Sequence, residues 1–154
     1  MKTDTTETID LLNPLIEICK DGCEGFKTAA DDSKDPELQA IFRRYSAQRS
    51  NFARELRELV GRLGGDPDKH GSVSGALHRG WINIKAAVSS NEPHAVLAEA
   101  ERGEDAAVAA YRDASEQIYD PIARDVVSRQ FIAVKAAHDN VRDLRDGPRY
   151  AKKK

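Results

Sequence analysis

Two glutamates, Glu101 and Glu104, are the residues whose type and spacing could do chemistry in this chain. They share one face of an expected helix with Leu97, Val108 and Tyr111, because these positions follow one another at steps of four, three, four and three residues. Both carboxylates should therefore point toward the core of a helix bundle. An unpaired charge there is strongly unfavourable, so a basic side chain, a metal ion or a proton must neutralise each acid.

Candidate partners for these acids lie on the apolar faces of other expected helices. Arg49 interrupts an apolar series on one helix, and His138 takes a core position on another. A guanidinium can bind one carboxylate through two hydrogen bonds, and the second acid can be met by His138 or Lys135. We therefore expect a buried polar layer whose charges nearly cancel and which fixes the helix register. Its members are Arg49, Glu101, Glu104, His138, Gln48, Gln130 and Lys135.

A second interpretation makes some of these residues metal ligands. Glu24, Glu101, Glu104 and His138 would offer mixed oxygen and nitrogen ligands to one Fe, Mn or Zn ion, with Arg49 turned outward. We expect the layer without a metal, and hence no cofactor and no catalytic residue. The alternative is a metal-binding protein or an oxidoreductase.

Apolar spacing and turn residues locate the helices that would hold these side chains. Apolar residues recur every three or four positions from Ile9 to Ala30, Leu38 to Leu63, Pro93 to about Tyr119, and Val127 to Leu144. Proline, glycine and aspartate signals separate these segments, and no segment shows the alternation of a strand. The sequence predicts four long helices.

About thirty residues separate the second and third long helices. That length lets the chain return along a bundle, so that the next helix starts at the opposite end. Ser72 can cap an additional helix there, with one apolar side formed by Val73, Leu77, Trp81, Ile84 and Val88. Trp81 is expected in the core, with a subunit interface as the alternative. The predicted fold is all-α, a four-helix bundle with a long crossover carrying an additional helix.

Length and charge set the expected domain organisation. The chain has 154 residues and a net charge of -2, which fits one domain and argues against nucleic-acid binding. We expect a flexible N-terminus over 1–7, one domain over 8–146 and a flexible basic tail over 147–154. No apolar run or leader is recognised, so we expect a cytoplasmic protein that does not bind a membrane.

The two cysteines, Cys19 and Cys23, lie four residues apart on one expected helix face. That placement orients them poorly for a mutual disulfide. We expect reduced thiols that pack as small core residues. No zinc-type spacing of cysteine and histidine is present.

Four short segments of the sequence carry a resemblance to a known family. They are Glu24-Gly25-Phe26, Gly75 to Trp81, Glu101 to Asp105 with Tyr111, and Ala137-His138. They resemble a bacterial family of four-helix-bundle proteins with no assigned function, within the ferritin-like superfamily. The resemblance covers roughly Thr8 to Asp146 and implies a ferritin-like bundle.

The resemblance also implies which metal ligands have been lost. Active ferritin-like proteins hold two irons with a Glu, a Glu-x-x-His, a Glu and a Glu-x-x-His on successive helices. Carried over to this chain, the pattern keeps only Glu104 and His138, and the other positions hold Cys19, Arg49, Phe52 and Lys135. A di-iron site needs mostly carboxylate oxygens, so the site looks degenerate.

The function expected from these residues is therefore non-catalytic. We expect a bundle that acts by self-association, as a dimer or larger homo-oligomer, or by binding a protein partner. A role in a stress response is suggested by fold analogy alone.

Overall fold

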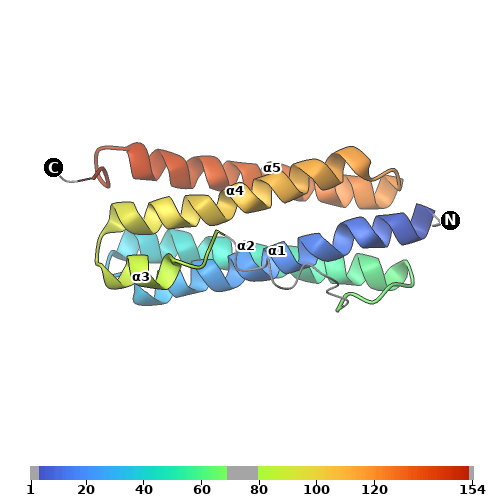
Figure 1. The fold of residues 1–154 in the computed structure, drawn as a ribbon, viewed down its shortest axis with the longest axis horizontal. Coiled ribbons are helices and arrows are strands. Elements are labelled where there is room, and N and C mark those ends of the chain that lie inside the picture. Colours follow the sequence, from blue (N-terminus) through green and yellow to red (C-terminus); the bar gives the residue numbers. More distant parts are fainter. Residues whose placement is uncertain (1–3, 69–79, 153–154) are drawn as a thin grey trace.

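The computed structural model describes residues 4–68 and 80–152 and is all-helical over these ranges. Its helices are α1 (Asp4–Asp32), α2 (Pro36–Arg62), α3 (Ile84–Ser89), α4 (Pro93–Gln117) and α5 (Pro121–Asp146). The antiparallel hairpin of α1 and α2 lies beside the antiparallel hairpin of α4 and α5 (Figure 1). The predicted all-α fold class is confirmed, and the four long segments correspond to the four long helices.

The connection between the two hairpins has to span the bundle. Helix α2 ends at one end of the bundle and α4 begins at the other (Figure 1). Within this connection, α3 packs against α1 and α4. The additional crossover helix is short where it is described, since it covers Ile84–Ser89 and leaves Trp81 in a turn. Ser72, Val73 and Leu77, expected at its start, lie outside the described residues.

Aspartate and proline residues set the starts of the long helices. The Asp35 carboxylate accepts hydrogen bonds of 2.9 and 3.2 Å from two backbone amides of the first turn of α2, where Pro36 takes the first position. Asp120 caps α5 by accepting from the Ala123 amide at 2.9 Å. After α2, Gly64 has a φ of +85°, a left-handed backbone conformation that glycine adopts more readily than other residues. These ends agree with the sequence signals.

The core contains two clusters of buried apolar side chains, one after the other along the bundle. On α2, one cluster ends at Tyr45 and the other begins at Ala53. On α4, the corresponding residues are Ala100 and Ala107. Two fully buried charged residues, Arg49 and Glu104, lie in the intervening turns. A polar layer therefore divides the core.

Both ends of the bundle differ from the expected domain limits. Helix α1 begins at Asp4, inside the segment 1–7, and its first turn is closed by a 2.9 Å hydrogen bond from Thr8 Oγ1 to the Asp4 carbonyl. At the other end, the Tyr150 ring is buried in the second core cluster and Arg149 forms an ion pair with Glu37. The segment after α5 thus packs on the bundle as far as Tyr150. This packing is favourable because burial of the ring removes apolar surface from water.

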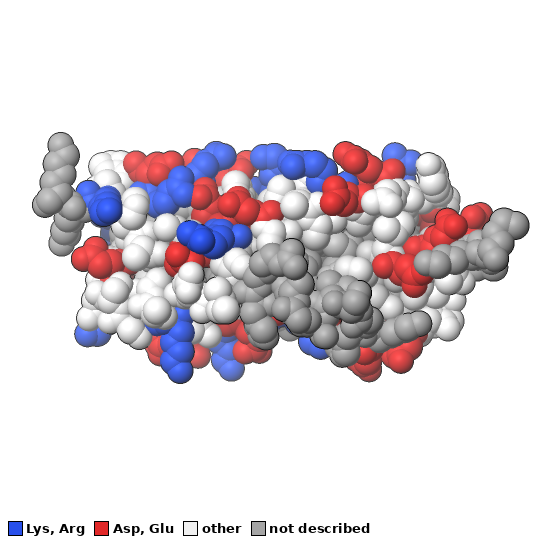
Figure 2. Space-filling view, in the orientation of Figure 1, with Lys and Arg blue, Asp and Glu red and all other residues white. Residues whose placement is uncertain are grey.

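The surface carries both signs of charge. On the face drawn in Figure 2, Lys and Arg side chains are interspersed with Asp and Glu side chains over most of the molecule. Across the described part of the chain, no helix is long and apolar enough to cross a membrane.

Candidate functional site

The centre of the bundle is occupied by an ion pair between Arg49 of α2 and Glu104 of α4. Arg49 Nη1 donates to Glu104 Oε1 and Nη2 donates to Oε2, both at 2.5 Å. The side chains are 1% and 0% exposed. Burial by itself would lower the pKa of Arg49, but the charge and hydrogen bonds of Glu104 raise it above its ordinary value. Both carboxylate oxygens are therefore bound by a guanidinium that keeps its charge.

Space for the Arg49 side chain comes from a glycine on α1. A Cβ atom at Gly22 would lie 3.2 Å from Arg49 Nη1 and 3.3 Å from Arg49 Cγ. The Phe26 ring lies one turn further, with its centroid 5.5 Å from Arg49 Cζ. Gln48 accepts a 3.2 Å hydrogen bond from Arg49 Nε. Helices α1, α2 and α4 together hold the guanidinium in place.

Beside the ion pair, Trp81 of the crossover inserts between α1 and α4. A Cβ atom at Gly25 would lie 2.2 Å from Trp81 Cε3, and one at Gly103 would lie 2.1 Å from Trp81 Cε2. Gly80 has a φ of +89°, and a Cβ there would lie 2.8 Å from the Gly103 Cα. We call Gly25, Gly80 and Gly103 the Trp81 socket. The socket buries Trp81 within the chain, as expected of a core aromatic, and its ring meets Phe26 edge-on with centroids 4.9 Å apart.

A chain of hydrogen bonds leads from the core to the surface on the other side of the ion pair. The Cys19 thiol lies 3.0 Å from the Tyr111 hydroxyl, which donates to Gln130 Oε1 at 2.7 Å. Gln130 Nε2 donates to Glu55 Oε1 at 2.7 Å, and Arg129 donates to Glu55 Oε2 at 2.6 Å. Since the Tyr111 proton is given to Gln130, the thiol of Cys19 acts as the donor to Tyr111.

Cys19 should be unreactive while the protein is folded. Burial raises the pKa of its thiol to about 11, against the opposing effects of the Tyr111 hydrogen bond and the Arg49 charge. Because the thiolate is the nucleophile, we expect a Cys23→Ser variant to react with an aromatic disulfide reagent at least about a hundredfold more slowly than a free thiol at neutral pH. Unfolding should expose the Cys19 thiol, so that one equivalent of the reagent is consumed.

The matched control is a Cys19→Ser variant, which retains the partly exposed Cys23. This thiol should react in the folded protein. Rapid labelling of the folded Cys23→Ser variant would contradict the prediction.

Glu101 does not join the buried layer. Its side chain is 14% exposed and forms an ion pair with Arg145 near the end of α5. This corrects the expectation that both acids point into the core. Glu104 lies on the buried face of α4, whereas Glu101 lies at the edge of that face next to α5. The two acids therefore bind two different arginines.

His138 and Lys135 also lie outside the layer, which corrects a second expectation. His138 Nε2 is 2.7 Å from Asp105 Oδ1, and its Nδ1 is 3.0 Å from Asp139 Oδ1. Burial alone would lower the pKa of His138, but the hydrogen bonds with Asp139 and Asp105 raise it above its ordinary value. Lys135 is exposed and pairs with Asp139 at 3.1 Å. Both basic groups thus neutralise surface acids rather than Glu104.

The structure does not bring together the four residues of the alternative metal site. Glu24 is exposed on α1, while Glu104, Glu101 and His138 contact the three different sets of partners described above. Over residues 4–68 and 80–152, no three His, Cys, Asp or Glu side chains are grouped so that they could hold a metal ion. Glu104, Glu101 and His138 each have partners other than a metal ion in this structure, and the metal-binding alternative stays a prediction.

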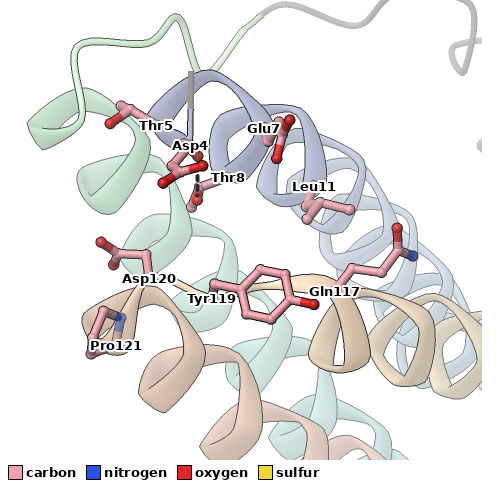
Figure 3. Close-up of a pocket in the computed structure, with 9 residues that line it drawn as sticks. All are labelled: Asp4, Thr5, Glu7, Thr8, Leu11, Gln117, Tyr119, Asp120 and Pro121. Atoms are coloured by element: carbon pink, nitrogen blue, oxygen red, sulfur yellow. Dashed lines mark hydrogen bonds between the residues drawn. The ribbon is translucent and has the colours of Figure 1, made fainter. Parts of the chain in front are cut away.

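An open cavity of about 320 Å³ lies at the end of the bundle that holds the start of α1. Figure 3 shows its lining residues, with the Tyr119 ring extending between Asp120 and Gln117. Asp4 and Glu7 add negative charge to its wall. The cavity lies far along the bundle from the ion pair, and its lining combines acids and an exposed tyrosine without a catalytic pair.

Comparison with protein families identifies the family of this chain. A family model described as a domain of unknown function (DUF2383) matches residues 7–117. No curated protein matches the chain. The matched segment ends at the last residue of α4 and includes both residues of the ion pair and the whole Trp81 socket.

Proposed function

The chain belongs to the DUF2383 family, whose function is unknown, and we propose that it is a non-catalytic helical bundle that acts by associating with other copies of itself. The observation that carries the non-catalytic part is the Arg49–Glu104 ion pair. Both oxygens of the fully buried Glu104 carboxylate are bound by Arg49. The charge of a carboxylate bound in this way is already balanced by the guanidinium and is not available to neutralise a metal ion.

We also propose that the fold is ferritin-like and that its di-iron site has degenerated. Support comes from the order of the elements, in which two antiparallel helix hairpins are joined by a connection that spans the bundle (Figure 1). Positions that would carry iron ligands in an active relative hold other residues here, namely Cys19, Arg49, Phe52 and Lys135. The buried ion pair takes the place of the metal as the polar centre of the bundle.

Exposed apolar side chains support the self-association part of the proposal. Ile82, Tyr119, Ile122 and Ile132 are between 65% and 82% exposed. Large apolar side chains in contact with water favour burial against another surface. The mixed surface charge gives nucleic acid no basic stripe to follow on the face seen in Figure 2.

Elemental analysis tests the non-catalytic part. Protein purified without a chelator or an affinity metal should contain far less than one equivalent of Fe, Mn or Zn, and the double variant Glu101→Gln with Glu104→Gln should contain the same amount. One or two equivalents in the parent, lost in the variant and accompanied by iron oxidation, would overturn it. Sedimentation velocity of the parent tests self-association, for which we expect a dimer or a larger species.

A further inference from the structure

The outer side of α5 carries a stripe of four exposed residues that is not used by the bundle core. Ile122, Asp125, Arg129 and Ile132 are spaced by three, four and three residues, so they lie on one side of the helix. Both isoleucines are highly exposed, at 65% and 73%. The opposite side of α5 carries the buried residues, including Val127 and Val134. We call these four exposed residues the α5 stripe.

The α5 stripe is self-complementary: when its order of side-chain types is read backwards, apolar positions face apolar positions and acidic positions face basic ones. It runs apolar, acidic, basic, apolar along α5. The pair Ile122 and Ile132 and the pair Asp125 and Arg129 share the same midpoint, residue 127. When two copies of α5 lie antiparallel about a two-fold axis at that midpoint, each isoleucine meets the other isoleucine of the second copy. Each aspartate then meets an arginine, and both contacts occur twice.

We propose that the α5 stripe is a two-fold symmetric docking surface for a second copy of this chain. The inference rests on the self-association proposed above and names the surface that performs it. Charge complementarity selects the occupant, since in a reversed copy the aspartate of one stripe faces the arginine of the other. The two pairs of isoleucines flank the charges and shield them from water.

Arg129 can take part in this contact without leaving its place in the chain. One of its terminal nitrogens donates to Glu55 of α2 at 2.6 Å, and about half of its side chain remains exposed. A guanidinium has five N–H donors, so it can bind Glu55 within the chain and Asp125 of the second copy at the same time. The Glu55 contact holds the guanidinium in position before docking.

Another exposed apolar residue does not offer the same match. Tyr119 lies in the cavity of Figure 3, whose lining also contains Asp4, Glu7 and Asp120. A two-fold contact there would place acidic groups of one copy against acidic groups of the other, which is unfavourable. Of these two surfaces, the α5 stripe is the one on which like copies attract.

A charge-exchange experiment tests the proposed register directly. In a homodimer of Asp125→Arg, two arginines face each other at each contact, and in a homodimer of Arg129→Glu two acids do so. Each variant alone should raise the dimer dissociation constant at least about tenfold. An equimolar mixture should form heterodimers, because the arginines of the first variant then face the acids of the second. Sedimentation equilibrium and native mass spectrometry measure both results.

Matched isoleucine variants provide the control. Ile132→Ser should weaken the dimer, whereas Ile82→Ser, at a site of nearly equal exposure outside α5, should leave it unchanged. Circular dichroism and thermal unfolding of each variant separate an effect on association from an effect on folding.

The outcomes distinguish this inference from the proposal on which it rests. If the parent self-associates and all four variants do so with the same affinity as the parent, the α5 docking surface is overturned and self-association stands. If Asp125→Arg and Arg129→Glu are each monomeric and their equimolar mixture stays monomeric, the proposed register is overturned. A parent that is monomeric at every accessible concentration overturns both the docking surface and self-association.

Discussion

Replacement of Glu104 by glutamine should lower the free energy of unfolding by about 3–5 kcal/mol, the cost typical of removing one partner from a buried ion pair. The substitution keeps the shape of the side chain but leaves the Arg49 guanidinium in the core without a counter-charge. Urea denaturation measures the change without adding salt that would screen the charges. Glu101→Gln is the matched control, and it should cost less than about 1 kcal/mol because the Glu101–Arg145 pair is partly open to solvent.

A double substitution separates two contributions to the lost stability: the loss of the ion pair itself and the burial of an unpaired charge. Arg49→Met together with Glu104→Leu removes both charges and fills the space with apolar groups of similar size. Buried ion pairs can often be replaced in this way without loss of stability, so the double variant should recover most of the stability lost in Glu104→Gln. If Glu104→Gln cost no more than Glu101→Gln, the ion pair would not be the polar centre of the fold.

The second large effect is expected when Gly103 is replaced by alanine. The added Cβ would lie 2.1 Å from Trp81 Cε2, a distance that forces the indole ring to move. We expect a loss of about 1–3 kcal/mol from overpacking. Trp81 is the single tryptophan of the chain, so its emission reports its surroundings directly. The emission maximum should shift to longer wavelength as the ring leaves the socket.

Two further variants test whether the clash with Trp81 causes the loss of stability in Gly103→Ala. Gly61→Ala, in a helix position where a Cβ would meet nothing within 4 Å, should raise stability by up to about 1 kcal/mol through helix propensity. Trp81→Leu in the Gly103→Ala background should relieve the clash and cost less than Trp81→Leu alone. Unchanged emission and stability in Gly103→Ala would show that the ring does not depend on the socket.

The long helices could be predicted from the sequence because apolar residues repeat at helical spacing over many turns. The same spacing placed Glu101 and Glu104 together, and the structure separates them. The buried face of α4 also includes Ala100, Gly103 and Ala107. These small residues add little to a hydrophobic pattern, so the centre of the face lies further from Glu101 than the large side chains indicate.

The contacts between helices were harder to predict. Nothing in the spacing along α5 identifies Arg145 as the partner of Glu101, because that contact depends on how α4 and α5 are rotated against each other. The hydrogen-bonded series from Cys19 through Tyr111 to Gln130 joins three helices and needs their relative heights as well. Tyr111 was expected in the core and Gln130 in the buried polar layer, and a buried tyrosine hydroxyl needs a polar partner, but nothing in the sequence paired these two residues.

The Trp81 socket also bears on the order in which the chain folds. Each hairpin joins neighbouring helices through a short turn, so its contacts close small loops and can form early. One wall of the socket, Gly25, belongs to the first hairpin and another, Gly103, belongs to the second. The indole can be enclosed only after the two hairpins have docked, so it closes late. Contacts that form after the folding transition state affect the unfolding rate and leave the folding rate unchanged, so we expect substitutions in the Trp81 socket to act mainly on the rate of unfolding.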